Sequence, residues 1–190
     1  MSRVFGIDLT GSEKRASGIA LLDGSNVEFT KRIKLDSELE AEAVKARVEL
    51  VSIDSPLSLP ENPDKIYRDC ELTLKRRGIG VFWCLLPTMK NLTMRGINLA
   101  TKLRSVGLKV IESYPGAAQD VLKIPRKQKG IQVLANALAE FGIRGNLDVS
   151  HDELDAVTAA IVGQYYLRGE YEALGCLIMP LGKERQLKLT

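Results

Sequence analysis

Acidic residues stand at the ends of three short apolar runs in this sequence. Asp8 ends "GID", Asp54 ends "SID" and Glu112 ends "VIE", and each run is typical of a buried β-strand. In open α/β sheets the reactive groups gather outside the carboxyl ends of the strands, so neighbouring strands would bring these carboxylates together. Two further acids, Asp152 and Asp155, are three residues apart in "HDELDAVTAA" and share one face of a predicted helix.

Carboxylates that converge repel one another, and burial raises their pKa values further. A group of four or five is therefore costly unless a cation neutralises it. Hard divalent cations such as Mg²⁺ or Mn²⁺ prefer these oxygen ligands, and two such ions about 3.5–4 Å apart serve phosphodiester hydrolysis. We therefore predict metal ligands at Asp8, Asp54, Asp152 and Asp155, and catalytic roles for these four residues and Glu112.

Each of these acids also has an ordinary structural interpretation. Asp8 and Asp54 precede "LTGS" and "SP", and both could form the turns that follow them. Asp152 lies in the first turn of a predicted helix, where acidic side chains complement the helix dipole. Glu112 begins "ESYPG", which is also a plain turn sequence. His151, the only histidine, could act as a base beside a metal, but such a residue is more often incidental at a helix start.

The elements that must position these acids predict an α/β fold. Apolar or alternating runs predict strands over 3–9, 16–22, 26–35, 50–54 and 108–114. Helical spacing predicts helices over 37–48, 93–107, 131–142 and 150–169, the last opening with the capping box of Ser150 and Glu153. Hairpins followed by alternating strands and helices indicate a mixed sheet covered by helices.

Composition predicts an ordinary globular protein. The 190 residues are 45% hydrophobic and 27% charged, with a net charge of +3, which permits a polyanionic partner without requiring one. Cys70, Cys84 and Cys176 are odd in number and lack metal-binding spacing, so we expect free thiols in a reducing compartment. We see no signal peptide and no apolar stretch long enough to cross a membrane, and we expect a cytoplasmic protein.

Six stretches resemble, in chain order, a family of predicted nucleases known as domain of unknown function 429. They are "GIDLTGS", "IDSPLSLP", "RGI", "RG", "IESYPGA" and "HDELDAVTAA", and the resemblance extends over nearly the whole chain. The family is similar to the ribonuclease H-like superfamily, near the RuvC-type Holliday junction resolvases. The resemblance implies one domain over 1–190, with three antiparallel and then two parallel strands. A helical and loop insert is expected at about 56–92, hereafter called the insert.

The resemblance also implies roles for individual residues. Asp8 matches the acid of the first strand, Asp54 the acid that ends the fourth strand, and Asp155 the acid on the last helix. Asp152 lies one helical turn earlier, where resolvases often hold a histidine or an aspartate. Glu112 lies outside the resolvase set, so the resemblance gives it no role.

We therefore predict a metal-dependent nuclease that hydrolyses phosphodiester bonds in DNA or RNA by a two-metal-ion mechanism. We expect a symmetric homodimer, as in resolvases. Phe82 and Trp83 could stack on bases or belong to a core or subunit interface. Basic residues that could track phosphates are Arg68, Arg76, Arg77, Arg95, Lys123, Arg126, Lys127 and Lys129.

Two alternatives of other classes stay open. "GIDLTGS" also resembles the phosphate loop of ATP-dependent phosphotransferases of the actin and sugar-kinase type. That fold needs two such domains, and this chain has room for one. The other alternative is a non-catalytic nucleic-acid-binding or scaffold protein that keeps the same fold.

Overall fold

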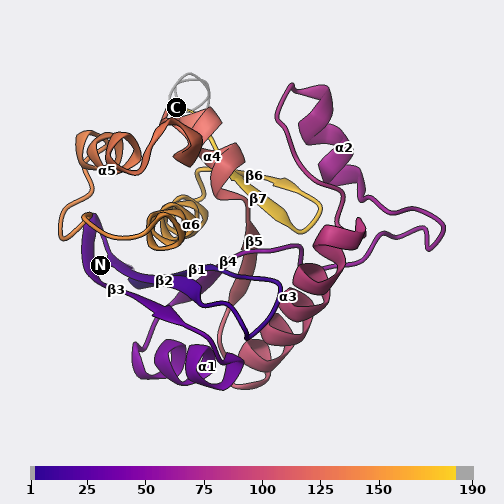
Figure 1. Ribbon diagram of the computed structural model, residues 1–190, viewed down its shortest axis with the longest axis horizontal. Coiled ribbons are helices and arrows are strands. Elements are labelled where there is room, and N and C mark those ends of the chain that lie inside the picture. Colours follow the sequence, from indigo (N-terminus) through magenta and orange to yellow (C-terminus); the bar gives the residue numbers. More distant parts are fainter. Residues whose placement is uncertain (1–2, 183–190) are drawn as a thin grey trace.

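The computed structural model describes residues 3–182 and contains one mixed sheet with helices on both faces (Figure 1). The strands lie in the order β3-β2-β1-β4-β5-β7-β6. Their bounds are β1 Arg3–Asp8, β2 Ser17–Asp23, β3 Asn26–Ile33, β4 Leu50–Asp54, β5 Val110–Ser113, β6 Tyr171–Leu174 and β7 Leu177–Pro180. The helices are α1 Asp36–Lys45, α2 Asp69–Arg76, α3 Pro87–Ser105, α4 Pro115–Leu122, α5 Ile131–Glu140 and α6 His151–Leu167, with a 3₁₀ turn η1 at Lys127–Lys129.

The predicted α/β class and the mixed sheet are confirmed, but the number of strands is wrong. Strands β1, β2 and β3 pair antiparallel, whereas β4, β5 and β7 continue the sheet parallel to β1. The described residues form 7 strands in place of the five that the family resemblance implied. The two additional strands are β6 and β7, which form an antiparallel hairpin around Gly175, a residue with a φ of +62°. Strand β7 covers the edge that β5 would otherwise leave unpaired.

Two helix starts differ from the prediction, and both involve proline. The sequence predicted that Pro115 and Gly116 form a turn ending the strand, but Pro115 is the first residue of α4. Pro87 likewise begins α3, six residues before the predicted start at 93. Proline favours the first helical position because its φ is already helical and that position needs no N–H partner. The prolines therefore mark helix starts here.

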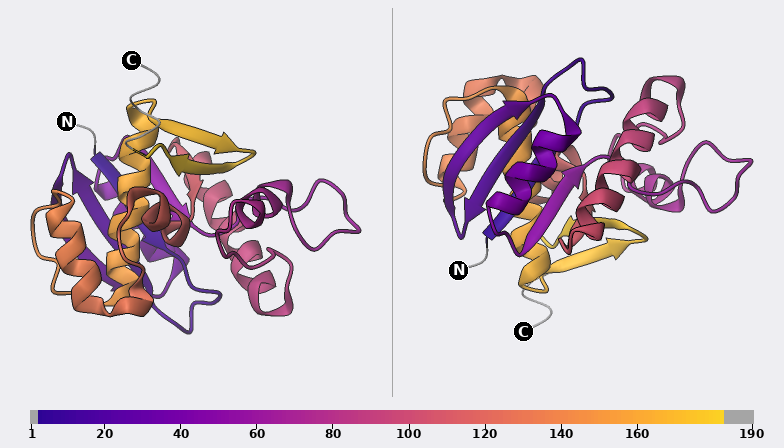
Figure 2. Two further views of the ribbon diagram at one scale, coloured as in Figure 1. Left: turned by 90° about the horizontal axis from the view of Figure 1, so that it is seen from above. Right: turned by 90° about the horizontal axis from the view of Figure 1, so that it is seen from below.

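The two faces of the sheet carry separate cores, and α6 covers only one of them. The upper core in Figure 1 joins residues such as Val4 and Leu50 to α4, α5 and α6. The lower core joins Phe5, Ile7 and Ile53 to α1 and α3 (Figures 1 and 2). Alternate residues of β1 thus point to opposite sides, as the two-residue period of a strand requires. Although several helices are largely buried, none within residues 3–182 is both long and apolar enough to cross a membrane.

Helix α6 lies unusually close to the sheet because glycines face it. A Cβ atom on Gly6 would overlap the carbonyl oxygen of Ala156, and one on Gly18 would overlap that of Asp152. The predicted capping box is confirmed: the Glu153 backbone N–H donates to Ser150 Oγ, and its carboxylate accepts from the Ser150 backbone N–H. The cap fixes where α6 begins, and the glycines fix how close its first turns come to the ends of β1 and β2.

Candidate active site

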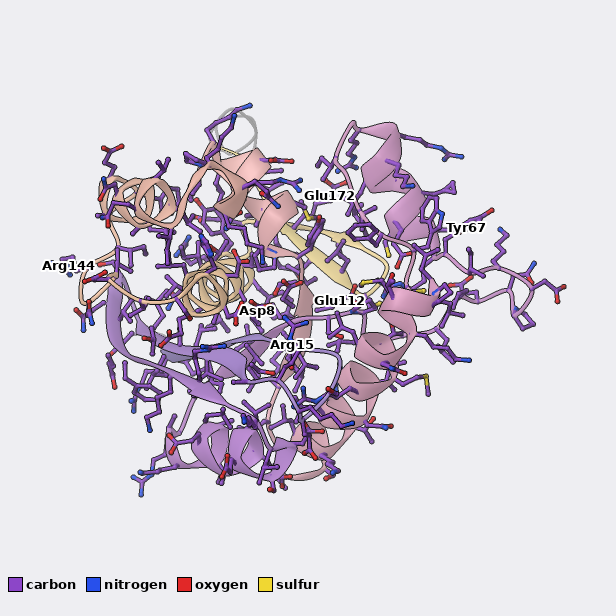
Figure 3. The ribbon with its side chains drawn as sticks, in the orientation of Figure 1. Asp8, Arg15, Tyr67, Glu112, Arg144 and Glu172 are labelled. Atoms are coloured by element: carbon purple, nitrogen blue, oxygen red, sulfur yellow. The ribbon has the colours of Figure 1, made fainter. Side chains whose placement is uncertain are left out.

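Asp8 and Asp54 end neighbouring parallel strands and lie side by side. They are register partners in the pairing of β1 with β4, and each is the last residue of its strand. Gly6 and Gly18 face α6 on this side of the sheet. Asp8 shares the face of Gly6, so both aspartates face the helix that carries Asp155. The structure therefore brings these three predicted residues to one place. Asp8 is labelled near the centre of Figure 3.

The crowding of these carboxylates changes their ionisation. Burial, followed by the charge of Asp155, raises the pKa of Asp8 from 3.8 to about 8. Burial, followed by the charges of Asp8 and Asp155, raises the pKa of Asp54 well above its ordinary value. Arg15, in the loop after β1, acts in the opposite direction on Asp8. Without a further cation, the fold therefore holds part of this cluster protonated near neutral pH.

Lys127 provides one cation inside the cluster. Its Nζ atom lies 2.7 Å from Oδ2 of Asp155, whose side chain is only 6% exposed. Gln119 of α4 donates to the other oxygen of Asp155 over 3.0 Å. Burial lowers the pKa of Lys127, but Asp155, Asp8 and Asp54 together outweigh burial and the net pKa is raised. The sequence interpretation placed Lys127 only among residues that track phosphates, because nothing in "KIPRKQKG" shows that η1 folds over the strand ends.

Asp152 lies beside this cluster but is turned toward β3. One of its carboxylate oxygens is 3.4 Å from a guanidinium nitrogen of Arg32. Its charge still raises the pKa of Asp8, after burial and Asp155. Asp152 is thus within electrostatic reach of Asp8 while it pairs with a surface arginine.

Glu112 is not brought into the cluster, because its side chain lies on the other face of the sheet. It pairs in register with Ile53, which belongs to the lower core. Its two carboxylate oxygens accept from the guanidinium of Arg68 at 2.7 Å each, and one also accepts from the Leu57 backbone N–H at 2.7 Å. This carboxylate is buried and bound by the insert, since Arg68 is the residue that caps the start of α2 and also pairs with Glu71.

Ser113 takes the place that the sequence analysis gave to Glu112. It is the register partner of Asp54, so its side chain lies on the same face as Asp54. Its hydroxyl is buried and has no hydrogen-bond partner among the described residues. The sequence analysis missed it by matching the acids that follow isoleucine. Matching Val51 with Val110 would have placed Ser113 opposite Asp54, as the structure does.

Several basic residues predicted to track phosphates are bound to carboxylates. Arg77 pairs with Glu172, and Arg126 pairs with Asp120. Arg95 is buried and pairs with Asp36, and it also donates to the Thr10 and Lys34 carbonyl oxygens. Arg95 therefore fixes the loop that follows Asp8 and is not available as a surface contact.

The donor chemistry of the cluster fits a hard divalent cation held partly by substrate. Within residues 3–182 no group of three or more histidine, cysteine, aspartate or glutamate side chains is placed to hold a metal ion. Mg²⁺, however, commonly uses only one or two carboxylates, with water and substrate phosphates filling the other positions. Asp8 and Asp54 form such a pair, and burial together with neighbouring carboxylates raises both pKa values, so a bound cation would offset that repulsion. Asp155 differs, because Lys127 already neutralises it.

Comparison with solved structures supports the fold. The structure described as "T. thermophilus RuvC in complex with Holliday junction substrate" aligns over 94% of this chain and 99% of that chain, with a TM-score of 0.55 and 13% identity. A second structure, "Thermus thermophilus RuvC structure", aligns over 94% and 99% with a TM-score of 0.48 and 15% identity. At such low identity the first match shows a shared fold and nothing more.

Comparison of sequences identifies the family. A search of curated proteins gave no match. The family model described as "Protein of unknown function (DUF429)" matches residues 6–175, which include every strand end and helix that supplies the acidic cluster. The resemblance inferred from the short motifs is thereby confirmed, and this chain belongs to the DUF429 family.

Proposed function

We propose that this protein is a metal-dependent nuclease that hydrolyses phosphodiester bonds in nucleic acid. The observation that carries the proposal is the register pairing of Asp8 with Asp54, facing Asp155 across a close helix–sheet contact. The RuvC-like fold supports it, since the neighbouring structure is a RuvC bound to a Holliday junction substrate. Carboxylates whose pKa values are raised by burial and mutual repulsion do not stabilise the fold. Such groups are common at functional sites, where a bound cation offsets their repulsion.

Asp8 and Asp54 would hold the metal ion, which is Mg²⁺ or Mn²⁺ by the preference of these cations for carboxylate oxygen. When bound, the ion activates a water and stabilises the leaving oxygen of the phosphodiester. Asp155 and Asp152 would bind a second ion. Asp155 could do so only after its ion pair with Lys127 breaks. Glu112 holds Arg68, so we assign it to the support of the insert.

The basic side chains at the cluster have separate roles in this proposal. Lys127 pairs with Asp155 and offers its ammonium group to a phosphate oxygen once substrate enters. Arg15 offers a second positive charge from the loop after β1, which Arg95 fixes through Thr10. Both residues therefore bind and orient the phosphate. We further propose a two-fold symmetric dimer, which suits a two-fold junction.

A screen of nucleic-acid structures tests the proposal. Labelled single strands, duplexes, RNA–DNA hybrids and four-way junctions are incubated with the protein and Mg²⁺ or Mn²⁺, and products are resolved on denaturing gels. We expect metal-dependent cleavage of at least one substrate class. Asp8→Asn should reduce that cleavage by about 100-fold or more, because changing even the outer partners of metal ligands costs about 10- to 100-fold.

The same screen separates the alternatives. Cleavage that survives Asp8→Asn would mean a contaminating nuclease or a different site. Stabilisation by ATP, measured as a rise in melting temperature when metal alone gives none, would favour a phosphotransferase. Binding of nucleic acid without cleavage, in both the wild type and Asp8→Asn, would favour the non-catalytic alternative.

A further inference from the structure

A small cavity opens directly beside the acidic cluster, and the proposed function gives it no role. Its lining includes Asp54 and Ser113 from the sheet, Tyr114 after β5, and Phe82 from the insert. The remaining lining is mainly apolar and includes Met89 and Leu92 of α3. The cavity therefore connects the strand end that carries Asp54 to the exposed surface of the insert.

The chemistry of this cavity suits a neutral planar ring. Its volume is about 80 Å³, which is less than the roughly 150 Å³ that takes up benzene in an engineered protein cavity. A ring would therefore enter by its edge and leave most of its face outside. Glu71 and Glu112 also line the cavity and share Arg68, so no unpaired cation of the described lining attracts a phosphate there.

Phe82 lines the cavity and its aromatic ring is exposed to solvent. Its side chain is 69% exposed, the highest exposure among the large hydrophobic residues that the structure describes. The loop that carries it is held in place, because the Tyr114 hydroxyl donates to the Gly80 carbonyl oxygen over 2.7 Å. A fixed and exposed aromatic ring offers a stacking surface, and base–aromatic stacking contributes about 1–3 kcal/mol per base.

Ser113 is one of the lining residues and carries a buried polar group. It is 2% exposed, and its Oγ atom has no hydrogen-bond partner among the described residues. A buried hydroxyl without a partner is unusual, because the lost hydration costs free energy. A ligand edge with a donor or acceptor would satisfy it.

From these observations we infer that the cavity takes up one unpaired nucleobase next to the phosphate that Lys127 and Arg15 orient at the acidic cluster. Phe82 stacks on the face of this base and Ser113 hydrogen-bonds its edge. The inference rests on the proposed function and narrows it: the substrate has an unpaired or unstacked base at the cleavage point. A fully paired duplex then reacts only after a base leaves its stack, which costs a few kcal/mol.

The test is a binding measurement that does not depend on cleavage. Fluorescein-labelled 15-mers of DNA and of RNA, single-stranded and fully paired, are titrated in Mg²⁺ with Asp8→Asn protein and followed by anisotropy. Adding Phe82→Ala should weaken single-strand binding about 5- to 150-fold, the loss expected for one stacking contact. Duplex binding should change less than about twofold. Val133→Ala is the control, since Val133 is also exposed at 44% but lies on α5, outside the cavity lining.

A second pair of variants tests the hydroxyl. Ser113→Ala should weaken single-strand binding about 3- to 10-fold, the loss of one hydrogen bond. Ser52→Ala is the control and should leave single-strand binding unchanged, because Ser52 does not line the cavity. The Ser52 Oγ atom is also buried and without a partner among the described residues. Circular dichroism checks that all variants are folded.

The possible failures are distinguishable. If the wild type cleaves nucleic acid but Phe82→Ala and Ser113→Ala bind single strands as it does, only the cavity inference is overturned. The same holds if Phe82→Ala weakens duplex and single strand equally. If Phe82→Ala instead turns a dimer into a monomer in sedimentation and leaves binding intact, the exposed ring serves a second copy and the inference is wrong. If the wild type neither binds nor cleaves any nucleic acid, both proposals fail.

Discussion

Asp54 of β4 lies opposite Ser113 of β5, one residue beyond Glu112. This offset of one residue puts Asp54 and Glu112 on opposite faces of the sheet, since side chains alternate along a strand. Asp54 faces α6 and the acidic cluster, whereas Glu112 faces the insert and binds Arg68. Two acids at neighbouring strand ends thus have opposite electrostatic surroundings, and their variants should behave in opposite ways.

Glu112→Ala should destabilise the protein. Removing this carboxylate leaves Arg68 buried without its bidentate partner, which costs about 3–5 kcal/mol in comparable buried pairs. Urea unfolding measures the change in the free energy of unfolding. The triple variant Arg68→Met, Glu71→Gln and Glu112→Leu should recover at least half of the loss, because none of the three paired charges then remains. Unchanged stability together with abolished cleavage would instead make Glu112 a catalytic residue.

Asp8→Asn should stabilise the metal-free protein at alkaline pH. The pKa of Asp8 is 3.8 in the ordinary state and about 8 in the folded protein, so the folded chain binds more protons between these values. Stability therefore falls as pH rises from about 4 to about 8, and the Asn variant removes the contribution of Asp8 to that slope. Thermal unfolding at several pH values measures it, since 1 kcal/mol shifts the melting temperature by about 2–4 °C at this length.

Asp54 contributes a slope of the same sign, because its pKa is also raised. Asp8→Asn should therefore reduce the slope of stability against pH but should not abolish it. A wild-type profile that rises over this range would contradict the assignment of raised pKa values to the cluster.

Lys127→Met should strengthen divalent cation binding and weaken cleavage. The ammonium group of Lys127 neutralises Asp155 and acts on Asp8 and Asp54, so it repels an incoming cation. We expect about tenfold tighter Mn²⁺ binding by calorimetry, equivalent to about 1.4 kcal/mol. Cleavage should fall because the phosphate loses its contact. Lys129→Met, an exposed change in the same 3₁₀ turn, is the matched control and should alter neither.

Gly6→Ala should displace α6 from the sheet. The added Cβ would overlap the Ala156 carbonyl oxygen and lie 2.8 Å from the Ala160 nitrogen, and both are backbone atoms that cannot turn aside. We expect a loss of about 1–3 kcal/mol in unfolding free energy, typical of overpacking, and a loss of cleavage as Asp155 moves. Gly80→Ala is the control, because nothing lies within 4 Å of its added Cβ. Equal effects of the two substitutions would contradict the close packing of α6.

The sequence predicted well those features that depend on local pattern. The S-x-x-E signature located the start of α6, because the cap is made by Ser150 and Glu153 alone. The apolar runs ending at Asp8 and Asp54 located two strand ends that prove to be register partners. Their convergence with Asp155 followed from the rule for strand ends in open sheets, and the structure brings them together.

The features that failed depend on contacts between distant segments. The face on which Glu112 lies is set by the register of β5 against β4, and no pattern inside "VIES" reveals it. The role of Lys127 depends on how η1 folds over the sheet, and that of Arg95 on the loop around Thr10. Strands β6 and β7 are only four residues each, too short for a clear period, and they form because β5 offers an open edge.

The central claim is that Asp8 and Asp54 together hold a divalent cation. The most direct measurement is anomalous diffraction from crystals soaked in Mn²⁺. We predict one anomalous peak within coordination distance of both carboxylates, absent from crystals of Asp8→Asn. The claim would be contradicted if saturating Mn²⁺ gave no peak at the ends of β1 and β4. It would also be contradicted if Mn²⁺ bound only elsewhere while the protein still cleaved nucleic acid.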